Sequence, residues 1–185
     1  PDGGTASVDG LDIVADYKRI RERVGYMPGR FSLYPDLSVG ENLAFFAALF
    51  GVEIAENYDL IAPIYRQIEP FRARRAGKLS GGMKQKLALC CALIHRPSVL
   101  FLSLVGSEMC IRDRDAVSRS EFWDMLSELK GKGISMLVST PYMDEAVRCD
   151  RVALCDGGKI LAVDTPQGVV GRFDEPLYAL AGDDM

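Results

Sequence analysis

Residues 79–85 are the part of this chain best suited to phosphate chemistry, and their sequence is Leu-Ser-Gly-Gly-Met-Lys-Gln. The hydroxyl of Ser80 and the glycines Gly81 and Gly82 stand at the start of a helical pattern that runs to about Ile94. The first amides of a helix have no intrahelical acceptor and carry partial positive charge, so they bind anions. Glycine also lets the backbone approach an anion closely. The alternative interpretation of the same residues is an ordinary serine N-cap.

A second position, where catalysis is expected, lacks the residues for it. The apolar run Val99–Leu102 has the character of a buried strand that arrives at an active site. In an enzyme of phosphate chemistry, acidic residues should follow such a strand directly, but Ser103 and Leu104 stand there instead. The chain also contains no G-x-x-x-x-G-K-S/T phosphate-binding loop.

The elements that must position these residues alternate between strands and helices, which predicts an α/β fold with a parallel core. Three of the predicted helices follow one another with no strand between them, and this favours a helical insertion. The sequence predicts, in order, a hairpin in residues 5–13, a strand end before Pro28, helices at 39–50, 58–68 and 81–94, a strand at 99–102, a helix at 118–133, a strand at 134–139, a hairpin at 151–164 and a short helix after Thr165.

Composition narrows the class of protein. The 185 residues are enough for one domain with a sizeable core, and the net charge of -4 argues against a basic nucleic-acid-binding surface. No pair of the five cysteines has C-x-x-C spacing, so we expect no zinc site and a reducing compartment. The longest apolar run, Leu43 to Phe50, is too short to cross a membrane. The chain begins at Pro1 without a methionine, and we interpret it as a piece of a longer protein.

Five segments, taken in order, resemble the ATPase domains of ABC transporters. They are residues 1–13 (after the phosphate-loop helix), 24–43 (the Q-loop and the entry to the helical subdomain), 79–85 (the signature motif), 115–123 (the D-loop) and 137–166 (the H-loop strand and the hairpin after it). The resemblance implies a P-loop NTPase-like parallel sheet with an inserted α-helical subdomain, incomplete at the N-terminus. We expect residues 1–28 to be a remnant of the nucleotide-binding core, 29–95 the Q-loop and helical subdomain, 96–170 the rest of the core and 171–185 a tail.

The resemblance also implies a mechanism, in which ATP with Mg²⁺ is hydrolysed between two such domains arranged head to tail. Each domain lends its signature motif to the site of the other. The residues expected to contact the partner's nucleotide are Ser80, Gly81, Gly82 and Gln85, and Asp115 takes the acidic position of the D-loop.

The receiving half of the site departs from the family pattern. Gly29 occupies the Q-loop glutamine position, Pro141 the H-loop histidine position, and Ser103 and Leu104 the acidic Walker B positions. No catalytic residue or metal ligand of this half survives, so we expect the chain as written to be inactive alone. The only histidine, His95, follows the signature helix, and we expect it to be a surface residue.

The segment Ser103–Arg114 is unlike the rest of the chain. Residues 104–113, Leu-Val-Gly-Ser-Glu-Met-Cys-Ile-Arg-Asp, resemble the in-frame translation of an adaptor used to prepare sequencing libraries. A genuine loop insertion is the alternative. The first interpretation predicts an acidic pair directly after Leu102 in the native gene.

The family resemblance implies an ATP-binding, energy-coupling subunit of a transporter, of exporter or multidrug type, on the cytoplasmic face of the membrane. Its partners are a second ATPase domain and transmembrane permease subunits. Phe31, Leu33, Tyr34 and Leu37 lie where the family docks on the membrane partner, or else they pack inside the subdomain. Two alternatives are a degenerate domain that only donates its signature motif and a soluble ABC protein of DNA repair or translation.

Overall fold

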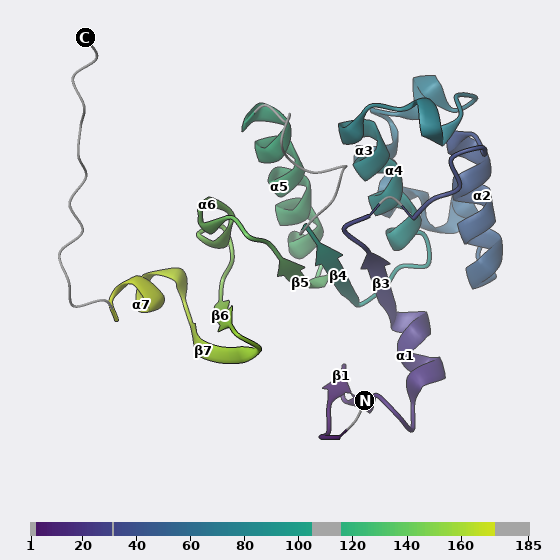
Figure 1. Cartoon of the computed structure of the whole chain (residues 1–185). Helices are drawn as coiled ribbons and strands as arrows, with labels where there is room; N and C mark the ends of the chain where they lie inside the picture. Colours follow the sequence, from purple (N-terminus) through teal and green to yellow (C-terminus); the bar gives the residue numbers. More distant parts are fainter. Residues whose placement is uncertain (1–2, 31, 105–115, 173–185) are drawn as a thin grey trace, which may run out of the picture. The chain divides into compact units, whose positions relative to one another are not determined.

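The computed structural model describes residues 3–30, 32–104 and 116–172, and its elements are labelled in Figure 1. The chain divides into two compact units, Pro1–Ser139 and Thr140–Met185. The boundary falls inside the segment 96–170, which was predicted from the sequence to be one part of the core. Each unit is described separately below.

A three-stranded parallel sheet forms the centre of the first unit. Its strands are β3 (Val24–Met27), β4 (Val99–Ser103) and β5 (Ser135–Ser139), with β4 in the middle. The predicted α/β fold with a parallel core is thereby confirmed. Along β4, Leu100 and Leu102 point into the core, whereas the opposite face carries Tyr26 and Leu137, which are 63% and 59% exposed.

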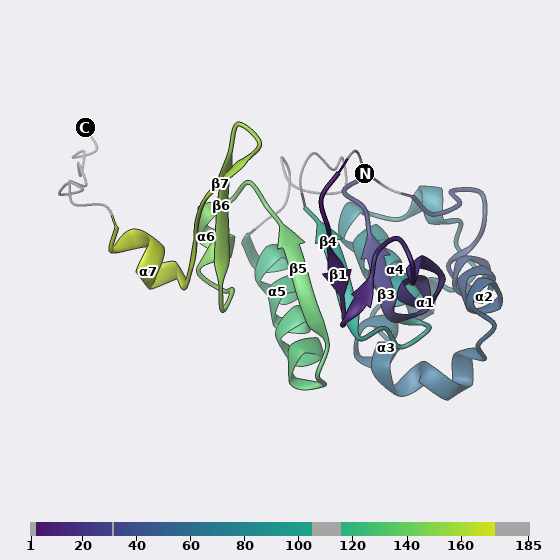
Figure 2. The same cartoon turned by 90° about the horizontal axis from the view of Figure 1, so that it is seen from below.

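Three helices lie between β3 and β4 in the sequence: α2 (Val39–Phe50), α3 (Tyr58–Tyr65) and α4 (Gly81–Leu93). Short 3₁₀ turns connect them: η1 (Ile54–Asn57), η2 (Glu69–Phe71) and η3 (Ala76–Lys78). They form the predicted helical insertion and gather on the β3 side of the sheet, while α5 (Ala116–Gly131), which connects β4 to β5, lies beside β5 (Figure 2). The residues predicted to face inward on α5, Phe122, Trp123, Leu126 and Leu129, are all buried.

Helix α4 packs directly on β3, and Gly25 permits the close approach. A Cβ atom at Gly25 would lie 2.5 Å from the carbonyl oxygen of Ala92 and 2.8 Å from Cδ1 of Leu100. The last residues of α4 therefore lie against the start of β3. Because the helix runs back along the strand, its first residues point toward the edge where the strands end.

Local signals set the ends of α2 as the sequence predicts. Ser38 Oγ accepts a hydrogen bond from the amide of Glu41 (3.2 Å), and Glu41 Oε2 accepts one from the amide of Ser38 (2.7 Å), which completes a capping box. The bond from the Ser38 amide is the main reason why the pKa of Glu41 is lowered. Gly51 ends the helix with φ 66°, in the left-handed region.

The N-terminal hairpin, β1 (Ser7–Val8) with β2 (Leu11–Asp12), is also confirmed, but a helix that follows it was not predicted. This is α1 (Tyr17–Arg23), and none of its residues is buried. It therefore lacks the apolar periodicity by which helices are found in a sequence. Asp12 Oδ1 accepts hydrogen bonds from the amides of Val14 and Ala15, both at 2.8 Å, in the turn that leads into it.

The second unit contains α6 (Met143–Ala146), the strands β6 (Val152–Asp156) and β7 (Lys159–Asp164), and α7 (Pro166–Val170). The strands form the predicted antiparallel hairpin, with Gly157 and Gly158 at positive φ in the turn. Thr165 Oγ1 accepts a hydrogen bond from the amide of Gly168 (3.0 Å) and caps α7. The short α6 was not predicted, because four residues are too few to show a helical period.

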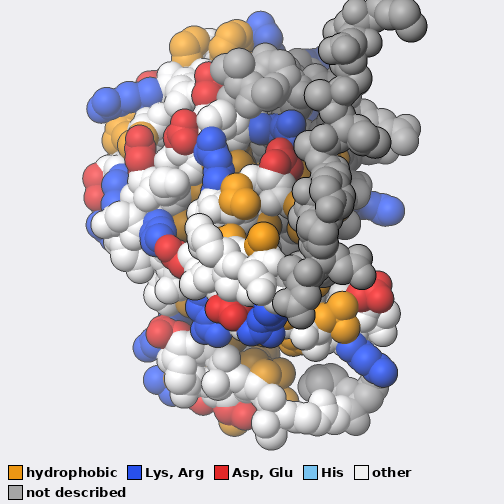
Figure 3. All heavy atoms as spheres, turned by 90° about the vertical axis from the view of Figure 1, so that its left-hand side faces the viewer, with side chains coloured by type: hydrophobic (Ala, Val, Ile, Leu, Met, Phe, Trp, Pro, Cys, Tyr) orange, Lys and Arg blue, Asp and Glu red, His pale blue; other side chains and the backbone are white. Residues whose placement is uncertain are grey.

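Side chains of both charge signs are interspersed on the face drawn in Figure 3. Within the described residues, no helix is both long and apolar enough to cross a membrane. The four described cysteines, Cys90, Cys91, Cys149 and Cys155, are free thiols. Burial raises the pKa of Cys90 and Cys91, so both thiols are unreactive in the folded chain.

Candidate functional site

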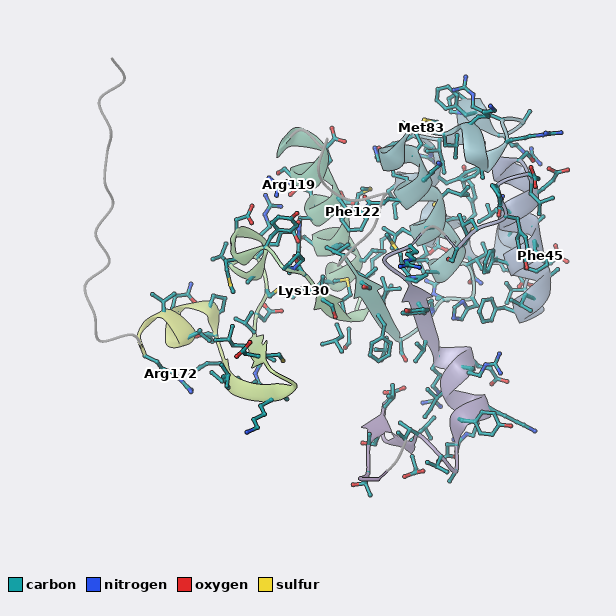
Figure 4. The ribbon with its side chains drawn as sticks, in the orientation of Figure 1. Phe45, Met83, Arg119, Phe122, Lys130 and Arg172 are labelled. Atoms are coloured by element: carbon teal, nitrogen blue, oxygen red, sulfur yellow. The ribbon has the colours of Figure 1, made fainter. Side chains whose placement is uncertain are left out.

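The N-terminal tip of α4 is exposed and is capped by a side chain of the predicted motif. Ser80 is the N-cap residue, with φ -65° and ψ 161°, and its Oγ accepts a hydrogen bond from the amide of Met83 (3.4 Å). Its carbonyl oxygen accepts the first intrahelical bond, from the amide of Lys84 (2.9 Å). Since Ser80 and Gly81 are exposed, the first amides of the helix lie at the surface. Figure 4 shows Met83 in this first turn.

Buried residues before the tip hold it in place. Ala76, the first residue of η3, and Leu79, which follows η3, are 0% and 6% exposed. The amide of Ala76 donates to the carbonyl oxygen of Leu37 (2.8 Å). The amide of Gly77 donates to the carbonyl oxygen of Pro35 (2.8 Å). These bonds join the entry to α4 to the loop that enters α2, so two segments far apart in the sequence fix the direction of the tip.

Gly82 has no structural neighbour that requires a glycine. A Cβ atom built on Gly82 meets nothing within 4 Å, and its φ does not lie in the left-handed region. Glycine in a helix costs about 0.5–1 kcal/mol relative to alanine. The described part of the chain therefore gives no packing reason for glycine here, and the space over Gly82 is open to a molecule from outside.

Gln85 lies apart from the other three predicted nucleotide contacts. Its side chain is 2% exposed and is buried in the body of α4, whereas Ser80 and Gly81 lie at the surface. The structure brings Ser80, Gly81 and Gly82 together at the tip and places Gln85 behind them. Direct contact of Gln85 with a nucleotide stays a prediction from the family resemblance.

The end of β4 is apolar where acidic residues are expected. Ser103 pairs with Ser139 across the sheet, and the amide of Leu104 donates to the carbonyl oxygen of Ser139 (2.7 Å). Leu104 is 3% exposed, so its side chain belongs to the core. The two residues thus occupy the predicted position at the carboxyl end of the central strand but present one hydroxyl and no carboxylate.

Gly29 and Pro141 also stand at the ends of strands. Gly29 is buried in the bend after β3 and has no side chain to offer a metal ion or water. Pro141 belongs to the second unit, between Thr140 and Tyr142. The Thr140 hydroxyl donates to Glu145 Oε2 (2.5 Å) and accepts from the amide of Tyr142 (3.1 Å), so a side-chain bond network shapes this turn.

A magnesium site does not fit the described residues. No group of three or more Cys, His, Asp or Glu side chains among them is arranged to hold a metal ion. The hydroxyl of Ser103 is the only polar side-chain group that Gly29, Ser103 and Leu104 supply, while Mg²⁺ prefers carboxylate and phosphate oxygens. Among the described residues, these three positions therefore offer no carboxylate ligand for Mg²⁺.

Two predicted residues, Asp115 of the D-loop and Phe31, lie outside the described residues. Of the other candidates for membrane docking, Leu33 is buried (6% exposed) and packs inside the subdomain, and Leu37 is half-buried. Tyr34 is 47% exposed, and its ring meets the ring of Phe45 edge-on at 4.8 Å between centroids. Phe45 lies on the outer side of α2 in Figure 4.

His95, expected from the sequence to lie at the surface, is half-buried in the structure. Its ring stacks on the ring of Phe50 with 3.7 Å between centroids, and its Nε2 lies 3.1 Å from the carbonyl oxygen of Val24. Sequence reasoning missed this residue because its partners lie 45 and 71 positions away. The one local signal was its place directly after the apolar run Leu87–Ile94.

A family model and two similar proteins point to the same family for this chain. The family model described as "ABC transporter" matches residues 1–102, more than half of the chain. "Probable multidrug ABC transporter ATP-binding protein YbhF" of Escherichia coli (strain K12) is 41% identical over 171 residues, which cover 91% of this chain and 29% of that protein. "Nod factor export ATP-binding protein I" of Burkholderia orbicola (strain AU 1054) is 34% identical over 173 residues, which cover 92% of this chain and 55% of that protein. The chain thus spans about a third to a half of the length of these relatives.

Solved structures show the same fold. A chain described as "Structure of ATP binding subunit of ABC transporter" superimposes with a TM-score of 0.76 at 25% identity, over 93% of this chain and 71% of that one. The cbiO1 protein from Clostridium perfringens, part of the ABC transporter complex cbiONQ, superimposes with a TM-score of 0.75 at 22% identity, over 92% of this chain and 69% of that one. The fold is therefore that of ABC ATPase subunits.

Proposed function

Because the chain belongs to the ABC transporter family, we propose that it is part of an ATP-binding, energy-coupling subunit that lends the tip of α4 to a nucleotide bound mainly by a second ABC domain. The two domains meet head to tail, and ATP hydrolysis between them drives transport across a membrane. The direction is export, which the name of the Nod factor relative supports.

The observation that carries this proposal is the exposed tip with an open space over Gly82. Ser80 fixes the start of the helix, and the amides of Gly81 and Gly82 have no intrahelical acceptor. A terminal phosphate seated there meets backbone donors and the positive end of the helix dipole. With no Cβ at Gly82, the phosphate approaches the backbone without a clash.

The tip contributes to catalysis by orientation and charge stabilisation. In phosphoryl transfer, negative charge is spread over the oxygens of the transferred group, and positioning plus electrostatic stabilisation supply most of the rate gain. One preorganised donor is commonly worth about a hundredfold to a thousandfold in rate. Because buried residues of two segments fix the tip of α4, its amides do not reorganise during the reaction.

A second form of the proposal is a silent half-site, and the strand ends favour it. Gly29, Pro141, Ser103 and Leu104 provide neither a carboxylate nor an imidazole at the positions where the family resemblance places them. In this form the chain offers its tip and its partner performs all hydrolysis. ATP and Mg²⁺ are then held by the partner's residues.

The membrane partner is a permease subunit that docks on the helical insertion from the cytoplasmic side. Three exposed apolar side chains support this contact: Tyr34, Phe45 and Leu49 are 47%, 39% and 63% exposed. Phe45 and Leu49 stand one helical turn apart on α2, so they share one face with the ring of Tyr34 packed on it. Exposed apolar groups that lie together are typical of interaction sites.

A complementation assay tests the lent tip. The chain is mixed with an ABC ATPase domain of the YbhF relative whose own signature motif has been disabled but whose phosphate loop is intact. We expect ATP hydrolysis to return when the chain is added and to be lost again with Ser80→Arg, because the arginine fills the phosphate seat. Hydrolysis that does not depend on Ser80 would remove the tip from the mechanism.

The matched control is Ala55→Arg, which places the same charge and bulk at an exposed position of η1. It should leave complementation unchanged. Formation of the mixed dimer is measured separately by analytical ultracentrifugation, so that loss of catalysis is distinguished from loss of assembly.

Sequencing native DNA without library adaptors separates the two forms of the proposal. An acidic pair directly after Leu102 would restore the Walker B carboxylates and support a working ATPase site. If Ser103 to Arg114 persists, the adaptor interpretation is wrong and the silent half-site gains support.

A further inference from the structure

The helical insertion is joined to the sheet by three consecutive residues after α4. We call them the α4 junction: Ile94, His95 and Arg96. The carbonyl oxygen of Ile94 accepts a hydrogen bond from Asn57 Nδ2 (2.8 Å). The two terminal nitrogens of Arg96 each donate to the carboxylate of Asp59 at 3.2 Å. His95 lies between these two contacts and is the residue on which the inference rests.

The ring of His95 contacts both parts that the junction joins. It stacks almost parallel on Phe50, the last residue of α2, with 13° between the ring planes. At the edge of the ring, Nε2 lies 3.1 Å from the carbonyl oxygen of Val24, the first residue of β3. A carbonyl oxygen only accepts, so Nε2 carries the hydrogen and the neutral ring keeps its lone pair on Nδ1.

Nδ1 is buried and has no hydrogen-bond partner among the described residues. Protonation of the ring adds an N–H and a full positive charge at this atom. A buried charge without a partner is costly, and the burial of the ring accordingly lowers the pKa of His95, while the bond to Val24 opposes this shift.

The charged groups on the surrounding elements do not offset this cost. Both neighbouring arginines are paired with carboxylates: Arg96 with Asp59 at 3.2 Å, and Arg23, which precedes β3, with Asp9 at 2.9 Å. Neither these pairs nor the carboxylates after α2 contribute to the pKa shift of His95, which arises from burial and the Val24 bond alone. Of the elements around the ring, α2 carries Glu41, α4 carries Lys84 and Lys86, η1 carries Glu56 after Glu53, and β3 carries no charged side chain.

We propose that His95 is a pH-sensitive joint: the neutral ring holds the end of α2 against the start of β3, and protonation releases it. The site is a regulatory contact between the helical insertion and the sheet. It does not depend on nucleotide and goes beyond the proposed transport function.

The sign of the effect follows from the direction of the pKa shift. Since the pKa of His95 is lower in the folded chain than its ordinary value of 6.5, the released ring binds a proton more readily than the packed ring. The contact is therefore at full strength above about pH 6.5 and weakens as the pH falls through the pKa of the folded chain. Each pKa unit of difference corresponds to about a tenfold change in the opening equilibrium.

The experiment uses the fact that the chain has a single histidine. The imidazole of the 185-residue chain is titrated by NMR, and amide hydrogen exchange is measured at pH 7.5 and pH 5.5 with correction for intrinsic exchange. We expect a titration midpoint below 6.5. We also expect faster exchange at pH 5.5 in the last turn of α2 and at the start of β3, with little change in α5.

Two substitutions and one control make the result specific. His95→Gln retains a side-chain donor for the Val24 carbonyl but has no proton to gain, so the pH dependence of exchange should disappear. Phe50→Leu removes the stack and should move the midpoint toward 6.5. Phe45→Leu, the same change at an exposed position of the same helix, should leave the midpoint where it is in the unsubstituted chain.

Three outcomes would overturn the proposal. They are a midpoint at or above 6.5 in the unsubstituted chain, an undiminished pH dependence in the His95→Gln variant, and a Phe50→Leu variant whose midpoint does not move. A variant that fails to fold does not leave the matter open, since the titration and the hydrogen exchange of the unsubstituted chain still test the proposal.

Discussion

The two ends of α4 differ in exposure: the N-terminal end lies at the surface, and the C-terminal end is buried. At the N-terminal end, Ser80 and Gly81 are exposed, and a Cβ at Gly82 would meet nothing. At the C-terminal end, Leu89, Leu93 and Ile94 are all 0% exposed, and a Cβ on the neighbouring Gly25 would strike the carbonyl oxygen of Ala92. The C-terminal end of the helix thus packs closely against β3, and the N-terminal end is accessible to an outside molecule.

This difference predicts which substitutions in α4 should alter stability and which should alter binding. Changes at the buried end alter the free energy of unfolding, because packed interiors tolerate neither cavities nor added atoms. Changes at the open end should cost little stability and act on binding. The following predictions test this contrast, from the largest expected effect on stability to the smallest.

Leu93→Ala should lower the free energy of unfolding by about 3 kcal/mol, because it leaves a cavity at a fully buried position. Urea unfolding followed by the fluorescence of Trp123, the single tryptophan, measures it. The matched control is Leu49→Ala on the exposed face of α2, which should change stability by less than about 0.5 kcal/mol. Equal losses in the two variants would contradict the contrast.

Gly25→Ala should destabilise the chain by about 2 kcal/mol, since the added Cβ would lie 2.5 Å from a backbone oxygen that cannot move without shifting α4. Thermal unfolding gives the measurement. Gly131→Ala, where a Cβ meets nothing within 4 Å, serves as the control and should not destabilise. An unchanged melting temperature in Gly25→Ala would show that helix and strand are less closely packed than the structure has them.

Ser80→Ala should cost about 1 kcal/mol, because the amide of Met83 loses its side-chain acceptor at the N-cap. The same denaturation assay measures this loss. Ser80→Asp retains an acceptor and should recover most of it, while a stable Ser80→Ala variant would mean that the 3.4 Å bond contributes nothing.

Gly82→Ala should have the smallest effect and the opposite sign, a gain of about 0.5 kcal/mol, because alanine is the better helix former and the space is open. In the complementation assay the same variant should hydrolyse ATP more slowly, since the methyl group occupies the approach to the backbone. A variant both more stable and fully active would separate the glycine from nucleotide binding.

Much of the fold was predictable because its signals are local. The capping box of Ser38 and Glu41, the stop at Gly51 and the turn at Gly157 and Gly158 each act within a few residues of one another. The alternation of strands and helices then gave the parallel sheet. The helices α1 and α6 were missed because each is short and has too little apolar periodicity to be seen.

In the candidate site, too, some features were predictable from the local sequence and others were not. A serine and two glycines before an apolar helix predict an exposed, capped tip, and the structure has one. Gln85 looked like part of the same motif, but its position on the helix turns it into the core. His95 looked like a surface residue at a helix end, yet it is half-buried: its ring stacks on Phe50, and its Nε2 lies near the carbonyl oxygen of Val24.

The sequence by itself determined the order of the elements, their caps and turns, and the chemical character of the α4 tip, because these follow from interactions between residues a few positions apart. Only the tertiary structure decided which end of α4 is buried against β3 and what surrounds His95. Those contacts join residues tens of positions apart, and no local pattern in the chain records which distant partners will meet.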